Sequence, residues 1–358
     1  MLAASAAGLV YAVRTWDGEY FSRDVPGGVV ATPARSRLWR VALDGGDCTA
    51  LTGPEENAEH PQVTRDGRWV YFQAQVQGLW RVRRMRPDGV EMASVAPVDP
   101  TCSAYGAALS ADGSQVAWTQ HDGRTGATFL AQADGTGARR IAPEFGYIYM
   151  AAVDASARRV VFSGPARDYR LGLAEAPDWE PRVLTPDLPD AFVPQFTPDG
   201  GAVVFIDRRG GLYVMTLAGA ERRQLADRVQ VEFFLSPQDE HGSTDVPSIS
   251  PDGCKVAFVQ TGCNSPPQIA VVEIATGHVE VMTRLPGVCG RVRWSPDGKH
   301  LGFVSFVGPR PQLFVMAAAG GAPRQITQEI GAVCAFDWIP VPAPADMGHA
   351  HRGIFRHA

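Results

Sequence analysis

Turn residues recur along the chain with a period of about 45 residues. A tetrapeptide of the type Ser/Thr-x-Asp-Gly stands at 64–67, 110–113, 197–200, 250–253 and 295–298, and Asp154-Ala155-Ser156-Ala157 is a degenerate copy. Proline at the second position pre-sets φ, and glycine at the fourth accepts a positive φ. Each copy therefore predicts a tight hairpin between two strands.

A fixed pattern of apolar residues follows each turn. An aliphatic residue lies three positions after the fourth turn residue and an aromatic residue lies five positions after it. These are Val70, Val116, Val160, Val203, Val256 and Leu301, followed by Phe72, Trp118, Phe162, Phe205, Phe258 and Phe303. Residues two apart share one face of a strand, so the pattern predicts a strand with a fixed register.

Two further strands complete each repeat. A third apolar segment, such as Leu313-Phe314-Val315-Met316, follows the aromatic strand, and a short outer strand closes on Leu-Thr or a similar pair, as in Ile326-Thr327. Four strands joined by hairpins form the blade of a β-propeller. We predict six such blades near 59–98, 105–142, 149–186, 192–226, 245–284 and 290–328.

The two ends of the chain supply a seventh blade. Leu9 and Tyr11 repeat the aliphatic–aromatic pair, and 335–339 parallels the innermost strand at 291–295. We therefore predict an all-β, seven-bladed propeller of four-stranded antiparallel blades, with one domain over 1–342 closed by pairing of 334–340 with 6–52. Closure removes the open edges of the sheet, so we expect a monomer. Residues 343–358 carry no strand pattern and are expected to form a tail.

The Ser-Pro-Asp-Gly turn, the following aromatic residue and the closing Leu-Thr pair resemble the PD-type, WD-repeat-like propellers typified by the TolB family. The resemblance covers residues 6–340. It implies the propeller fold. Related propellers include the oligogalacturonate lyases, which use several histidines around a divalent metal on one face, and the non-catalytic propellers of prolyl-oligopeptidase-type enzymes.

Composition narrows the class of protein. The formal net charge is −5, which leaves no basic surface for many phosphates, so nucleic acid is not an expected partner. No apolar segment reaches the ~18–20 residues of a membrane helix. The first 13 residues resemble a signal sequence without a basic region, and their removal would delete a strand, which favours a cytoplasmic protein. The six cysteines lack metal-binding spacing and are expected to be free thiols.

The candidate site lies on one face of the ring. In a propeller, the loops entering the innermost strands and the loops joining the second and third strands lie on the same face. Two long segments fall there, at 15–36 and 227–245. The candidate ligand-binding residues are Trp16, Tyr20, Glu59, His60, Tyr105, Tyr149, Phe192, Asp245 and Arg291. Aromatic walls with an acid, a base and a histidine suit a sugar or a peptide. Alternatively, these side chains plug the channel mouth and satisfy one another.

Two functions remain open. The first is a non-catalytic propeller, which the absence of a nucleophile motif favours. Its ligand would be a protein, peptide or glycan, and no cofactor is expected. The second is a lyase that cleaves uronate-containing glycans by β-elimination, with His60 or His241 as the base and Arg291 as the partner of the carboxylate. A metal-assisted lyase would require His60, His121 and His241 to converge on one ion.

Overall fold

The computed structural model describes most of the chain. The described residues are 6–16, 34–95, 99–110, 112–121, 126–145, 148–164, 169–218, 221–233, 243–262, 264–306, 308–329 and 331–341. The predicted tail at 343–358 lies outside these ranges.

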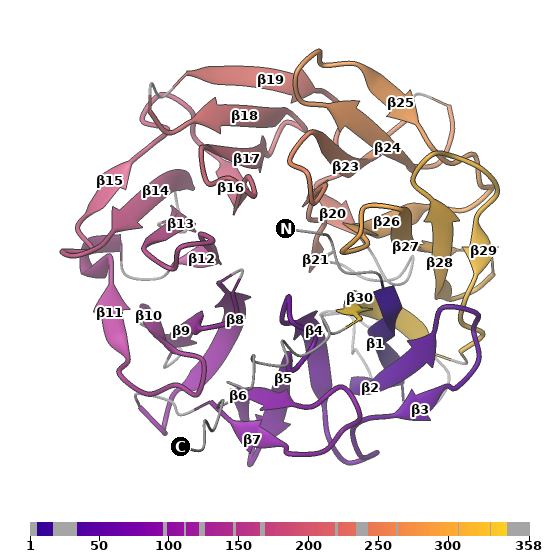
Figure 1. Ribbon diagram of the computed structural model, residues 1–358, viewed down its shortest axis with the longest axis horizontal. Coiled ribbons are helices and arrows are strands. Elements are labelled where there is room, and N and C mark those ends of the chain that lie inside the picture. The colour runs from indigo at the N-terminus through magenta and orange to yellow at the C-terminus, as the bar shows by residue number, and fades with distance from the viewer. Residues whose placement is uncertain are drawn as a thin grey trace, which may run out of the picture.

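In these residues, seven four-stranded antiparallel sheets stand around a central axis (Figure 1). In order from the innermost strand, the sheets are β30 (Ala332–Pro340), β1 (Ala6–Trp16), β2 (Ala34–Ala42), β3 (Thr49–Ala50); β4 (Ala58–Val63), β5 (Val70–Val76), β6 (Leu79–Met85), β7 (Ala93–Ser94); β8 (Ser103–Leu109), β9 (Gln115–His121), β10 (Gly126–Gln132), β11 (Arg139–Ile141); β12 (Tyr149–Val153), β13 (Arg159–Gly164), β14 (Arg170–Glu175), β15 (Pro181–Val183); β16 (Ala191–Phe196), β17 (Ala202–Asp207), β18 (Leu212–Thr216), β19 (Arg222–Ala226); β22 (Ser248–Ile249), β23 (Lys255–Gln260), β24 (Gln268–Glu273), β25 (Val279–Val281); and β26 (Cys289–Trp294), β27 (His300–Phe306), β28 (Pro311–Ala317), β29 (Arg324–Gln325). A small ribbon, β20 (Glu232–Phe233) with β21 (Ser243–Thr244), and one 3-10 turn at Pro143–Phe145 complete the described elements.

The predicted seven-bladed propeller is confirmed. Its ring closes through β1 and β30, which pair antiparallel with Leu9 opposite Trp338 and Tyr11 opposite Phe336. The Tyr11 hydroxyl donates a 2.6 Å hydrogen bond to Glu329 Oε1, so the N-terminal strand is also tied to the loop before β30.

The repeated turn folds through its own side chains. In the copy at 295–298, Ser295 Oγ donates to Asp297 Oδ1 (2.6 Å) and accepts the His300 N–H (2.9 Å). Gly298 has φ +70°, which an L-residue with a side chain rarely adopts. In the degenerate copy, Asp154 replaces the hydroxyl residue and accepts the N–H groups of Arg158 and Arg159, both at 2.9 Å.

The Leu-Thr pair at the end of a blade also has a structural role. Thr283 Oγ1 accepts the Ile269 N–H (2.9 Å) and donates to Gln268 Oε1 (2.9 Å). Thr327 binds Leu313 in the same way. The threonine therefore satisfies a buried N–H of the third strand at the point where the outer strand ends.

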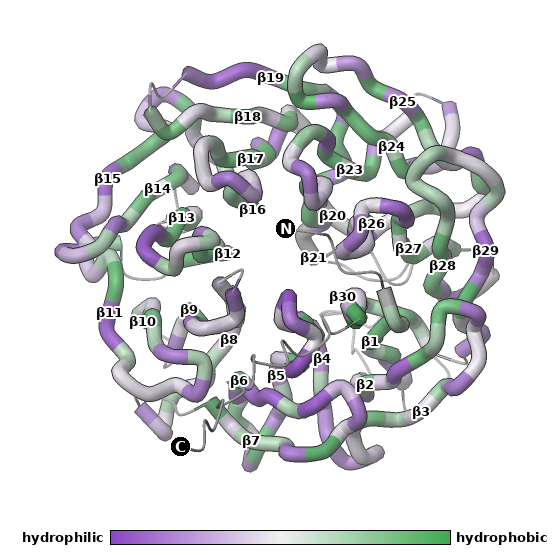
Figure 2. The backbone as a smooth tube through the Cα atoms, in the orientation of Figure 1, coloured by the Kyte–Doolittle hydropathy of each residue, from purple (hydrophilic) through white to green (hydrophobic). Residues whose placement is uncertain are grey.

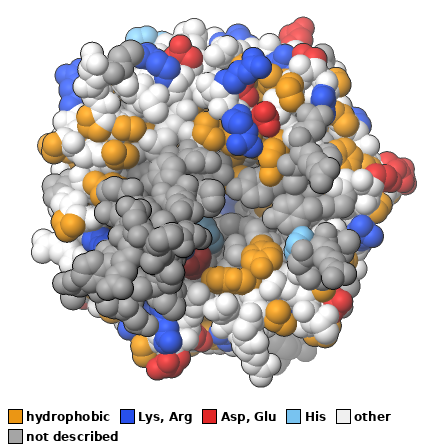
Figure 3. Space-filling model, turned by 180° about the vertical axis from the view of Figure 1, so that it is seen from behind, with side chains coloured by type: hydrophobic (Ala, Val, Ile, Leu, Met, Phe, Trp, Pro, Cys, Tyr) orange, Lys and Arg blue, Asp and Glu red, His pale blue; other side chains and the backbone are white. Residues whose placement is uncertain are grey.

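Packing between blades supplies the core. The aromatic residues of the second strands, including Phe72, Phe162 and Phe303, are fully buried. Hydropathy along the chain follows this arrangement, with hydrophobic residues concentrated in the second and third strands of the blades (Figure 2). On the face opposite to that of Figure 1, the described charged side chains of both signs are interspersed around the outer edge of the molecule (Figure 3). No helix among the described residues is long and apolar enough to cross a membrane.

Candidate functional site

The innermost strands place equivalent residues in layers along the central channel. We call the end with the Ser/Thr-x-Asp-Gly turns the turn face, and the end where the innermost strands begin the loop face. From the turn face inward, the rim consists of Arg65, Ala155, Pro198, Pro251, Pro296 and Pro340, followed by an apolar layer of Val63, Leu109, Val153, Phe196, Ile249, Trp294 and Trp338. Deeper still lies a polar layer that includes Gln62, Gln195, Ser248, Arg293 and Asp337.

The polar layer joins neighbouring blades. Gln62 Nε2 donates to the Ala107 carbonyl (2.6 Å), and Asp337 Oδ2 accepts the Val63 N–H (2.8 Å). Arg293 Nη1 donates to a carbonyl of the preceding blade at 3.3 Å. Because each of these bonds spans two blades, the side chains in the middle of the channel fix the spacing of the ring.

A β-bulge interrupts six of the seven described innermost strands near the loop face. Five of the bulges contain a residue with positive φ, namely His60 (52°), Gly106 (63°), Met150 (52°), Val193 (58°) and Arg291 (59°). A bulge places one extra residue opposite its partner strand and redirects the side chain. Arg291 is therefore the equivalent of His60 in its own strand. Glu59, Tyr105 and Phe192 occupy the position just before the bulge residue.

Glu59 and His60 form the core of the candidate site. Glu59 Oε1 accepts hydrogen bonds from Arg14 Nη2 (2.6 Å) and Ser36 Oγ (2.9 Å). Burial raises the pKa of Glu59, but the charge of Arg14 and the two hydrogen bonds lower it more, so the net shift is downward. Glu59 is thus a carboxylate on β4 that is held by side chains of β1 and β2 in the closing blade.

His60 is kept neutral although its side chain is 45% exposed. Its Nε2 lies 3.8 Å from Glu59 Oε2. The surrounding channel wall disfavours the imidazolium, Glu59 favours it, and the charges of Arg291, Arg14 and Arg293 oppose it, which together lower the pKa of His60 to about 4. The loop-face mouth therefore combines an accessible neutral imidazole with the charges of nearby arginines.

Asp245 has a different position from the one that its sequence suggests. It is 3% exposed, and its Oδ1 accepts the N–H groups of Arg291 (3.0 Å) and Val246 (3.1 Å). Burial raises the pKa of Asp245, while Arg291 and Arg293 lower it, and the net direction is upward. Asp245 thus connects the blade of β22 to that of β26.

The remaining predicted residues divide into two groups. Phe192 is buried, with its ring centroid 6.4 Å from that of Tyr169, and Tyr105 is half-buried on β8. His121 ends β9 opposite Ser103 and Gly126. The backbones of Trp16 and Tyr149 lie at the loop-face ends of β1 and β12. The side chains of Trp16 and Tyr149, and all of Tyr20 and His241, lie outside the described residues.

No three His, Cys, Asp or Glu side chains gather into a possible metal site within the described part of the chain. The described cysteines, Cys48, Cys102, Cys254, Cys289 and Cys334, are free thiols. Cys263 lies outside the described residues.

Sequence reasoning missed Arg14, Ser36, Arg293 and Asp337. Arg14 and Ser36 reach Glu59 only because β1 and β2 close the ring next to β4. Arg293 and Asp337 had a detectable signal: each precedes a channel-lining tryptophan, at the position that Gln62 and Gln195 occupy in other repeats. A polar residue at that position faces the channel.

The comparisons with known proteins agree with this architecture. The family model described as the PD40 TolB beta propeller domain matches residues 238–341. The Tol-Pal system protein TolB of Alcanivorax borkumensis is 40% identical over 55 residues, which are 15% of this chain and 13% of that protein. The uncharacterized peptidase YuxL of Bacillus subtilis is 33% identical over 87 residues, which are 23% of this chain and 13% of that protein. The match therefore spans a small part of each of these relatives.

Solved structures extend the likeness to most of the chain. An oligogalacturonate lyase in complex with manganese has a TM-score of 0.61 at 15% identity, covering 88% of this chain and 94% of that one. TolB from Acinetobacter baumannii has a TM-score of 0.50 at 17% identity, covering 80% of this chain and 82% of that one. At these identities, the likeness shows the fold.

Proposed function

We propose that this chain, a TolB-like β-propeller, is a non-catalytic binding protein that captures a protein, peptide or glycan at the loop-face mouth of its channel. Within that class, the charges favour an acidic ligand, such as an acidic peptide segment or a uronate-containing glycan. The observation that carries the proposal is the environment of His60.

Three arginines act on His60, and the nearby acids are already engaged. Arg291, Arg14 and Arg293 all disfavour its protonation. Glu59 is bonded to Arg14 and Ser36, and Asp245 is buried with its pKa shifted towards the neutral acid. A ligand carboxylate placed beside His60 would be attracted by the charges of these arginines.

The rigidity of the mouth also supports binding. Bulges with positive φ at His60 and Arg291 and the inter-blade bond from the Arg291 N–H to Asp245 hold the site on strands. A site that is ordered before the ligand arrives loses less conformational entropy on binding.

A binding array tests the proposal. It carries acidic peptides, basic peptides, oligogalacturonates and neutral oligosaccharides, and it is probed with the wild-type protein, Arg291→Gln and the control Arg68→Gln. Arg68 belongs to the turn-face hairpin between β4 and β5, and its side chain is 71% exposed. We expect the wild type and Arg68→Gln to bind acidic probes and Arg291→Gln to lose about tenfold or more in affinity. Wild-type binding to none of the probes, or equal binding by Arg291→Gln, would overturn the proposal.

A uronate lyase is the second candidate, because the mouth holds a neutral imidazole close to arginines. His60 has the protonation state of a general base at neutral pH, and Arg291 could neutralise a uronate carboxylate. The test follows the ultraviolet absorbance of unsaturated product from tetragalacturonate, with and without manganese or calcium. A rise that His60→Ala abolishes would make the protein a lyase, and no rise under any condition would exclude this activity on that substrate.

A further inference from the structure

The turn face of the channel holds a cavity that lies at the other end from the proposed site. A space of about 290 Å³ is lined by the rim and the apolar layer. A deeper space of about 470 Å³ shares Val63, Thr64, Arg65, Ile249 and Asp337 with it, so the two are continuous.

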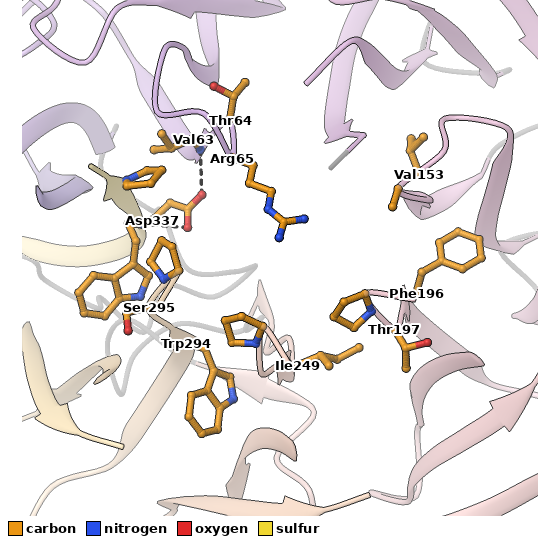
Figure 4. Close-up of a pocket in the computed structure, with 16 residues that line it drawn as sticks. Val63, Thr64, Arg65, Val153, Phe196, Thr197, Ile249, Trp294, Ser295 and Asp337 are labelled. Atoms are coloured by element: carbon orange, nitrogen blue, oxygen red, sulfur yellow. Dashed lines mark hydrogen bonds between the residues drawn. The ribbon is translucent and has the colours of Figure 1, made fainter. Parts of the chain in front are cut away.

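Arg65 breaks the pattern of the rim. The equivalent positions of the other repeats carry proline (Pro198, Pro251, Pro296 and Pro340) or alanine (Ala111 and Ala155). Arg65 instead extends a long cationic side chain into the central space, with Val153 and Phe196 on the opposite wall (Figure 4). No hydrogen bond or ion pair joins its side chain to another residue in the part of the chain that the structure describes.

The charges of the lining leave Arg65 in excess. The two cavities have two other charged lining residues among the described ones, Arg293 and Asp337. Asp337 accepts the N–H groups of Val63 (2.8 Å) and Trp338 (2.9 Å), and its charge attracts that of Arg293. These two opposite charges offset one another, and the guanidinium of Arg65 remains.

A second polar group in the lining has no partner. Trp294 contributes its ring to the wall, and its buried indole N–H makes no hydrogen bond within the described residues. A buried donor without an acceptor is rare in folded proteins, since it costs the desolvation of that group. The cavity thus offers the exposed guanidinium of Arg65 as a donor between apolar walls, to which the ring of Trp294 contributes.

We propose that this cavity binds a carboxylate with an apolar body. Arg65 holds the carboxylate with a charge-assisted hydrogen bond, and the apolar body packs against Trp294, Phe196 and the proline rim. A small apolar acid and the C-terminal carboxylate of a peptide that ends in an apolar residue share this chemistry.

Calorimetric titration with four probes tests the proposal and distinguishes the two sources. The probes are 3-phenylpropionate, 3-phenylpropionamide, an acetylated Ala-Ala-Phe peptide with a free carboxylate, and the same peptide with a C-terminal amide. We expect saturable binding of at least one carboxylate and about tenfold weaker binding of its amide, because only the carboxylate can pair with Arg65. Binding of the peptide acid but not of the small acid would assign the site to peptide C-termini.

Three variants locate the binding. Arg65→Gln should weaken the carboxylate probe about tenfold and bring it level with the amide, while Arg68→Gln on the same hairpin should leave it unchanged. Arg291→Gln, at the loop face, should also leave it unchanged, which separates this site from the proposed function. Melting curves confirm that each variant is folded. No binding of either acid to the wild type, or undiminished binding by folded Arg65→Gln, would overturn the proposal.

Discussion

At the scale of single residues, the two mouths of the channel are set by departures from the repeat. His60 and Arg291 occupy bulges where other blades carry Gly106, Met150 or Val193, and Arg65 occupies a turn position where other blades carry proline or alanine. Other blades form the same bulge or turn with other side chains, so the fold does not require histidine, arginine or a charge at these positions. Such positions are therefore where we expect ligand chemistry.

His60 predicts a pH dependence of stability. Its pKa is about 4 in the folded protein and near the ordinary 6.5 in the unfolded chain. Between these values the unfolded chain binds the proton and the folded protein does not, so the free energy of unfolding falls as the pH decreases from 6.5 to about 4. His60→Gln removes this part of the dependence, and urea unfolding at several pH values should show a shallower decline. Parallel curves for the variant and the wild type would contradict the shift.

Arg65 predicts a gain in stability on substitution. Arg65→Pro restores the residue found in four other repeats, and the Arg65 N–H makes no backbone hydrogen bond among the described residues. Proline restricts the unfolded chain, so the free energy of unfolding should rise by about 0.4–1 kcal/mol. Urea denaturation measures this change. A loss of stability would mean that the arginine side chain supports the fold.

At the scale of elements, each blade depends on a few repeated contacts. Replacing Thr283 by valine removes the acceptor of the Ile269 N–H and the donor to Gln268 without changing the shape of the side chain. We expect Thr283→Val to lower the free energy of unfolding by about 1–3 kcal/mol, because the N–H stays buried. Val281→Ala is a matched control on the same outer strand, since Val281 is 43% exposed, and it should have little effect. Equal losses in the two variants would contradict the assigned role of the threonine.

The closing blade predicts a larger effect. Phe336 on β30 is 4% exposed and lies opposite Tyr11 of β1. Phe336→Ala should lower the free energy of unfolding by about 3–5 kcal/mol, because it opens a cavity where the two chain ends meet. Chemical denaturation checks the value. A cost below about 1 kcal/mol would mean that the closure contributes little to the stability of the ring.

At the scale of the whole molecule, the sequence predicted the ring better than its chemistry. The in-phase residues from Val70 to Phe303 specify each blade, and Leu9 and Tyr11 indicate the closure, because these positions depend on local alternation and burial. Glu59 and His60 were found because the same strand register predicts them at the mouth of the channel. Arg14 was not, since it reaches Glu59 only after the chain ends pair. The burial of Asp245 and the one-residue offset of Arg291 follow from contacts between blades and from bulges, which the strand pattern does not reveal.

The proposed function requires an acidic ligand to bind beside His60 at the loop face. NMR titration of the histidine imidazoles, with His60 assigned through His60→Gln, examines this contact in the free protein and with tetragalacturonate or hexaglutamate. We expect His60 to titrate near pH 4 when free and at a higher pH when a probe is bound, because the bound carboxylate stabilises the imidazolium. An unchanged His60 titration with both probes at saturating concentration would contradict the proposed function.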